Sequence, residues 1–164
     1  MAVASFDCFG ETDPRKMPTH LFFGALHIDY GSAQRADVAK QDFSVCPRHW
    51  YVNATFRCKA CDTKFVFSAE EQRFWYEERR FYVDSRPRQC PACRKQDRRM
   101  KLLKQRYDSL ISKAVAGKDV GAKQAVVSLL DELASSSYPL TKRTAERRQL
   151  LLKQIKKQQA EGKR

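Results

Sequence analysis

The sequence lacks any run of about 18 or more uncharged apolar residues, so nothing in it predicts a segment that crosses a bilayer. Its first residues also lack the basic stretch followed by an apolar stretch that marks a secretory signal. We therefore expect a cytoplasmic protein with no membrane partner. No internal repeat is visible, and 164 residues suit one domain with appendages.

Histidine is scarce, and its positions argue against a catalytic role. All three histidines (His20, His27 and His49) precede Cys58, and none lies between the later cysteine pairs. A zinc-dependent nuclease of the ββα-metal type needs a histidine in that interval, so this alternative has little support. No Ser/His/Asp or Cys/His nucleophile pattern is recognisable either. We expect a protein that is not an enzyme.

Acidic residues are too few to balance the basic ones, and the excess is uneven. The formal net charge is +13. Residues 1–45 carry 4 Lys/Arg against 6 Asp/Glu, residues 46–94 carry 10 against 6, and residues 95–164 carry 18 against 7. A cationic field of this kind attracts polyanions, which makes nucleic acid or a ribonucleoprotein the expected partner. The alternative is a solvated helix face that only aids solubility.

Six cysteines are present, and four of them form two Cys-x2-Cys pairs separated by 28 residues. In a reducing compartment such pairs favour metal binding over disulfides. Four thiolates match the tetrahedral preference of Zn²⁺ and leave no open position for catalysis, so we expect one structural zinc ion. The alternatives are four unlinked buried thiols or an iron–sulfur cluster. The expected metal ligands are Cys58, Cys61, Cys90 and Cys93.

A second metal site is a weaker hypothesis. Cys46 and His49 have Cys-x2-His spacing, and Cys8 with His20 or His27 would complete four ligands. The alternative is that Cys46 behaves as a small buried apolar side chain.

Short strands and one helix are expected around the cysteines. Alternating aromatic and polar residues predict a hairpin with Cys58–Cys61 at its tip. Ser68 and Glu71 have the spacing of a capping box, which predicts a helix over residues 69–82. Pro87 and Pro91 predict an extended approach to the second cysteine pair.

Helical periodicity dominates the rest of the chain. Apolar residues spaced by three and four predict one helix from about Lys95 to Gly117, a second around Val120–Leu133, and a third from Thr141 or Thr144. The expected fold is therefore α+β: a small zinc ribbon of short antiparallel strands with an inserted helix, followed by an α-helical C-terminal extension. We expect an N-terminal segment at 1–45 that packs on the ribbon, the zinc-ribbon domain at 46–97, and a basic helical extension at 98–164.

The cysteine region resembles a known family. The stretches that carry the resemblance are Phe56-Arg57-Cys58-Lys59-Ala60-Cys61, Phe65-Val66-Phe67-Ser68-Ala69-Glu70-Glu71-Gln72, Trp75-Tyr76-Glu77 and Arg88-Gln89-Cys90-Pro91-Ala92-Cys93-Arg94. They are similar to the bacterial "probable zinc-ribbon domain" family over about residues 46–100. The resemblance implies zinc binding through the four paired cysteines, and it implies neither a reaction nor a defined target.

Two functional classes remain open. The first is a nucleic-acid or ribonucleoprotein binder, and the second is a protein–protein interaction adaptor that uses the apolar stripes of the helical extension. The place of those stripes separates the two, because stripes that pack against each other leave no apolar patch for a partner. The candidate nucleic-acid-binding residues are Arg79, Arg80, Arg86, Arg88, Arg98, Arg99, Lys101, Arg147 and Arg148.

Overall fold

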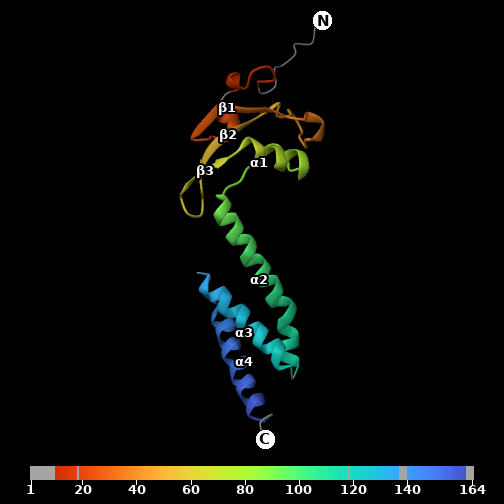
Figure 1. Ribbon diagram of the computed structural model, residues 1–164, viewed down its shortest axis with the longest axis vertical. Coiled ribbons are helices and arrows are strands. Elements are labelled where there is room, and N and C mark those ends of the chain that lie inside the picture. Colours follow the sequence, from red (N-terminus) through yellow and green to blue (C-terminus); the bar gives the residue numbers. More distant parts are fainter. Residues whose placement is uncertain (1–9, 18, 118, 137–139, 162–164) are drawn as a thin grey trace. The chain divides into compact units, whose positions relative to one another are not determined.

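The computed structural model describes residues 10–17, 19–117, 119–136 and 140–161, and of residues 20 and 21 only the backbone (Figure 1). The described chain divides into two compact units, the first ending at Arg94 and the second starting at Lys95. The first unit holds the sheet and the second is helical, which confirms the expected α+β class with a helical C-terminal part. No helix within the described ranges is long and apolar enough to cross a membrane.

A three-stranded antiparallel sheet organises the first unit, in the order β1-β2-β3. β2 (Trp50–Arg57) and β3 (Lys64–Phe67) form the expected hairpin, with Arg57 paired to Lys64 at the turn. β1 (His27–Arg35) comes from the N-terminal segment and pairs with the other edge of β2, with an irregularity between Asp29 and Gln34. Three 3-10 turns accompany the sheet: η1 (Pro14–Lys16), η2 (Thr19–Phe22) and η3 (Val38–Lys40).

An aromatic core lies against the sheet. In β3, Phe65 and Phe67 are buried while Lys64 and Val66 are exposed, as the period of two in a strand requires. The ring of Phe67 lies 5.2 Å from that of Trp75 in an edge-on arrangement. The buried members of this core are Tyr51, Ala54, Phe56, Cys58, Phe65, Phe67, Ala69, Tyr76, Val83 and Cys90.

The helix after β3 is shorter than predicted. Ser68 Oγ accepts the N–H of Glu71 at 3.1 Å, so the predicted cap is present at the start of α1 (Ala69–Arg73). The chain then continues as a π-helical turn, η4 (Phe74–Glu78), which ends before the left-handed residue Arg80 (φ +54°). The prediction of one helix over 69–82 is therefore wrong in its second half. The spacing of apolar residues does not distinguish the wider π-helical turn from an α-helical one.

Buried hydrogen bonds hold the segment that returns from η4 to the second cysteine pair. The guanidinium of Arg48 donates to the carbonyl of Val83 at 2.7 Å, and the hydroxyl of Tyr76 donates to the carbonyl of Ser85 at 2.6 Å. Gln41 donates to the Arg48 carbonyl at 2.7 Å. Because these groups are removed from water, each bond anchors the segment rather than merely replacing a solvent contact.

Three helices form the rest of the chain: α2 (Pro91–Ala116), α3 (Val120–Ser135) and α4 (Lys142–Glu161). α2 begins about one turn earlier than predicted, directly at the second cysteine pair. Pro91 is the first residue of this helix, a position that suits proline because its missing N–H would have no partner there. The carboxylate of Asp119 caps α3 by accepting from Gly121 N–H at 2.8 Å.

The apolar stripes of the helical unit pack against each other. α3 provides most of the fully buried side chains, and Met100, Leu103 and Tyr107 of α2 are partly buried against them. The buried members are Ala114, Val126, Val127, Leu130, Leu133, Leu151 and Ile155. In the described part of this unit, the large apolar side chains left exposed are Leu102, Val115 and Leu150.

We predict that Phe67→Ala lowers the free energy of unfolding of the first unit by about 3–5 kcal/mol, the usual cost of emptying a buried aromatic site. Phe67 is 0 % exposed, whereas its neighbour Val66 is 48 % exposed on the opposite face of β3. Val66→Ala is therefore the matched control and should change stability by less than about 1 kcal/mol. Denaturant unfolding of the metal-loaded protein measures both, and equal losses would contradict this assignment of the two faces.

Candidate metal centre

The first cysteine pair lies in the loop that joins β2 to β3. The N–H of Cys58 donates to the carbonyl of Thr63 at 2.9 Å, and the N–H of Asp62 donates to the carbonyl of Cys58 at 3.0 Å. Asp62 adopts a left-handed conformation (φ +61°), which lets the loop reverse within six residues. These local bonds turn both cysteines of the hairpin tip toward one side.

The second pair lies at the start of α2. Cys90 immediately precedes Pro91, the first helical residue, and Cys93 lies in the first turn. The N–H of Lys59 donates to the carbonyl of Arg88 at 2.9 Å, so a backbone hydrogen bond joins the first loop to the segment that leads into the helix. The two pairs, distant in sequence, are thereby held against each other.

The four cysteine sulfurs converge on one point. All four donor atoms lie within 4.8 Å of one another, and the sulfurs of Cys61 and Cys90 are 3.8 Å apart. A tetrahedron with Zn–S bonds of about 2.3 Å has an S···S edge of about 3.8 Å, so the spacing suits a four-coordinate ion. Cys58 and Cys90 are buried, Cys93 is half-buried and Cys61 is exposed. The four predicted ligands are thus placed to bind a metal ion.

Backbone N–H groups point at the sulfurs, as thiolate ligands require. The N–H groups of Cys90 and Ala60 lie 3.2 Å and 3.4 Å from the Cys58 sulfur. The N–H of Cys93, in the first turn of α2, lies 3.5 Å from the sulfur of Cys90. Such donors lower the energy of the charged thiolates and orient their lone pairs.

The sulfurs also influence one another's ionisation. Burial works to raise the pKa of Cys58, but the N–H groups of Cys90, Cys61 and Ala60 outweigh it and lower that pKa to about 6. The neighbouring thiols of Cys90 and Cys61 raise the pKa of Cys93 to about 12. Four thiols this close resist full ionisation by themselves, and a bound cation removes that obstacle.

The described residues assemble this one group of three or more candidate metal ligands. Cys46 and His49 do not join a further group within the described ranges. Cys8, which the hypothesis of a second site invoked, lies outside the described residues, as does the side chain of His20.

An ion pair connects the inserted helix to the metal-binding region. Arg94, which follows Cys93, donates to the carboxylate of Glu71 in α1 at 2.5 Å, and both side chains are largely shielded from solvent. The Arg94 guanidinium also lies 5.5 Å from the Trp75 ring. The sequence predicted that Glu71 would reach back to cap its own helix, whereas its carboxylate contacts the start of α2.

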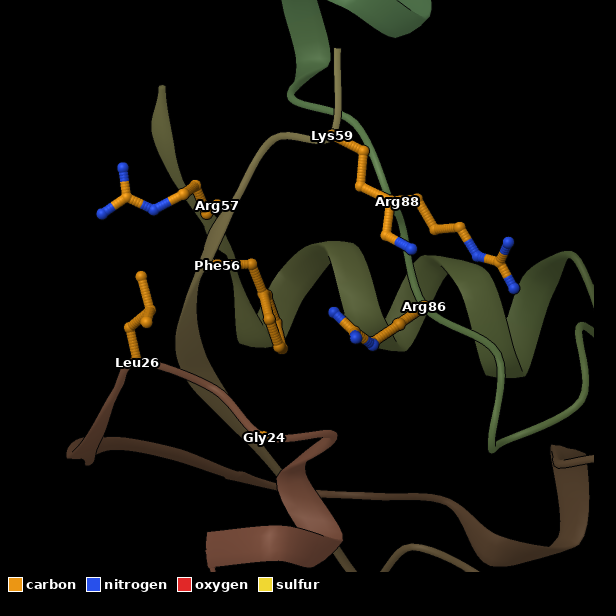
Figure 2. Close-up of a pocket in the computed structure, with 7 residues that line it drawn as sticks. All are labelled: Gly24, Leu26, Phe56, Arg57, Lys59, Arg86 and Arg88. Carbon is orange, nitrogen blue, oxygen red and sulfur yellow. The ribbon is translucent and has the colours of Figure 1, made fainter. Parts of the chain in front are cut away.

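The arginines predicted to contact nucleic acid in the first unit separate into two groups. Arg86 and Arg88 line a cavity of about 180 Å³ beside the hairpin tip (Figure 2). Arg79 instead lies over the Phe74 ring at 5.1 Å, and Arg80 donates to the carbonyl of Lys40 at 2.6 Å. The residues that line the cavity are Gly24, Leu26, Phe56, Arg57, Lys59, Arg86 and Arg88.

Sequence reasoning missed the contribution of Arg57 and Lys59 to this cavity. The hydrogen bond between Lys59 N–H and the Arg88 carbonyl brings the two stretches together. That pairing follows from closure of the cysteine cluster, so the spacing of the cysteines was the signal that pointed to it.

In the helical unit, the residues predicted to contact nucleic acid differ in their exposure and in whether they form ion pairs. Arg98 and Lys101 are exposed on α2. Arg99 forms an ion pair with Glu132 at 2.6 Å, and Arg148 forms one with Asp131 at 2.5 Å. Arg147, the remaining predicted contact, is half-buried on α4.

Comparison with known proteins supports the metal centre. Neither a curated protein nor a solved structure matches the chain. A family model described as "Probable treble clef domain" matches residues 53–101, which include all four clustered cysteines. The expected likeness to a zinc-ribbon-type family is thereby confirmed for this region. Residues 53–101 are similar to the probable treble clef domain family, which is zinc-binding.

Proposed function

We propose that this protein is a non-enzymatic zinc protein that binds nucleic acid or a ribonucleoprotein through its basic helices. The zinc site is structural in this proposal and the cationic surface is functional. The observation that carries the binding part is the large set of exposed cations in the helical unit that form no ion pair with any other described residue.

The donor set supports zinc as the ion. Four thiolates are soft ligands, and a closed tetrahedral S4 site is typical of structural zinc. Such a site offers no open position to a water molecule or a substrate, so the ion serves the fold rather than a reaction. An iron–sulfur cluster is the alternative for the same ligands, and metal analysis separates the two.

The charge of the helical unit supports a polyanion partner. Residues 95–164 carry 18 Lys/Arg against 7 Asp/Glu. The ion pairs within the described part of this unit are Arg99–Glu132, Arg148–Asp131 and Lys157–Glu161. A set of exposed cations forms no ion pair with any other described residue: Lys95, Arg98, Lys101, Arg106, Lys113, Lys142, Arg143, Lys153 and Lys156. Phosphates attract such a surface and release counterions on binding.

The packing of the apolar stripes weighs against the protein adaptor. Partly buried apolar residues of α2 pack against the buried cluster, most of whose members come from α3 and α4. Leu102 and Val115 are exposed on different faces of α2, and Leu150 is exposed on α4. Isolated apolar side chains are common on monomeric proteins and do not make a docking patch.

We predict one zinc ion per chain, with loss of the fold of the first unit when it is removed. Structural zinc binds with about 10–16 kcal/mol, as much as the 5–15 kcal/mol that holds a whole domain folded. Chelation, or the variant Cys90→Ser, should therefore abolish the cooperative unfolding of this unit. Elemental analysis and thermal unfolding measure the two effects.

The control for that experiment is the double variant Cys46→Ser/His49→Ala, which should keep one zinc ion per chain. A wild-type content of two zinc ions that falls to one in this variant would establish the second site. Iron in place of zinc, or a fold that survives complete chelation, would contradict a structural zinc centre.

We predict that the protein binds RNA or DNA oligonucleotides with an affinity that falls steeply with salt. The triple variant Arg98→Gln/Lys101→Gln/Arg106→Gln should weaken binding at least about tenfold at low salt. Its slope of log affinity against log salt should be shallower by about 2, since each lost phosphate contact removes about 0.7–0.9. Titration by fluorescence anisotropy at several salt concentrations measures both quantities.

The matched control removes three exposed cations from the acidic N-terminal segment, as Arg15→Gln/Lys16→Gln/Lys40→Gln. It changes the net charge equally but should leave the affinity within about threefold of the wild type, because Arg15 and Lys40 already have carboxylate partners in Asp13 and Asp37. Wild-type binding that persists unchanged at 0.5 M salt would argue against phosphate contacts.

A further inference from the structure

We propose that the cavity beside the hairpin tip, lined by Lys59, Arg86 and Arg88, binds one phosphate group of a nucleic-acid strand. This inference rests on the proposed function and gives it a defined contact in the first unit. All the residues involved belong to that unit, so the site is complete within it.

The cavity gathers positive charge without any acidic residue in its lining. Arg57 forms an ion pair with Asp62 at 3.0 Å, and in Figure 2 its guanidinium points away from the other cations. Lys59, Arg86 and Arg88 form no ion pair with any other residue that the structure describes. Like charges placed this way repel one another until an anion lies between them.

The walls that carry these cations are held before any ligand arrives. The carbonyl of Arg88 accepts from Lys59 N–H at 2.9 Å, and the N–H of Leu26 donates to Thr55 in β2 at 2.8 Å. The guanidinium of Arg86 lies 4.8 Å from the ring of Phe56, which is itself buried. Ordering of the side chains therefore costs less on binding than it would on a mobile surface.

Size indicates what the cavity accepts. Pockets for complete small molecules usually enclose about 300–1,000 Å³, so a cavity of about 180 Å³ suits a single group of a larger ligand. The buried ring of Phe56 offers no free face for a base to stack on. Arginine and lysine around a small open space are typical of phosphate recognition, and the rest of the strand would continue outside.

A second explanation for these cations is that they balance the metal centre. Four thiolates and one divalent ion carry a formal charge of −2, and the neighbouring N–H groups already stabilise the sulfurs. If balance were their role, loss of Arg86 and Arg88 would reduce zinc content. The experiment therefore measures zinc in every variant.

The test compares two double variants that each remove two arginines from the first unit. Arg86→Gln/Arg88→Gln changes the cavity, whereas Arg79→Gln/Arg80→Gln changes arginines outside it. Their affinities for a labelled 12-nucleotide single-stranded RNA, and for the DNA of the same sequence, are measured at about 50 mM salt. The cavity variant should bind at least about tenfold more weakly and the control within about threefold of wild type, since phosphate contacts are charge-assisted hydrogen bonds.

A parallel measurement uses the unmodified protein with inorganic phosphate as the probe. The side-chain Nε–Hε signals of Arg86 and Arg88 should shift on titration, while those of Arg79 and Arg80 stay in place. Shifts at Arg86 and Arg88 in a protein that binds no oligonucleotide would show an anion cavity and overturn both the nucleic-acid assignment and the proposed function.

Three further results would overturn the cavity alone. Equal losses of affinity in the two double variants would leave nucleic-acid binding in place but make it a matter of general charge. Absence of any phosphate-induced shift at Arg86 and Arg88 would remove the cavity as an anion site. Loss of zinc from the cavity variant would assign its arginines to the metal centre.

Discussion

The convergence of four sulfurs is the constraint on which the first unit depends. Cys58 and Cys61 must face Cys90 and Cys93 within 4.8 Å, although 28 residues lie between the pairs. The intervening chain leaves β3 through α1 and η4 and then returns to Cys90. Hydrogen bonds from Arg48 and Tyr76 to the carbonyls of Val83 and Ser85 hold the returning segment. Because both ends of that excursion are fixed at one point, a metal ion there stabilises everything in between.

The metal centre and the aromatic core are one structure. Cys58 and Cys90 are buried in the same cluster as Phe56, Phe67 and Tyr76. Two of the four ligands thus belong to the core itself, so metal binding contributes directly to folding of the unit. Metal binding, packing of the sheet and the Arg94–Glu71 ion pair consequently stabilise one another. A change at the sulfurs should therefore also destabilise the inserted helix.

Local patterns predicted those features that depend on near neighbours in the chain. The hairpin followed from alternation, the α1 cap from Ser68 and Glu71, and the three C-terminal helices from their apolar spacing. The start of α2 was missed because the sequence does not distinguish a proline at the first position of a helix from one in an extended segment. The π-helical η4 was missed because the same residue types occur in π-helical and α-helical turns. The cavity was missed because it joins residues 57–59 to residues 86–88, and only the folded metal site brings them together.

The sequence gives the number of charged residues correctly, but it does not show which of them are paired in the folded protein. Arg99 and Arg148 contributed to the predicted basic surface, yet each is neutralised by a carboxylate of α3. Lys59 was absent from the predicted nucleic-acid-binding residues, yet it lines a cavity with Arg86 and Arg88. A net charge therefore indicates the class of partner, whereas the distribution of unpaired cations indicates where a phosphate can be held. Among the residues that the structure describes, such cations include an extended set on the helices and the three that line the cavity beside the hairpin tip.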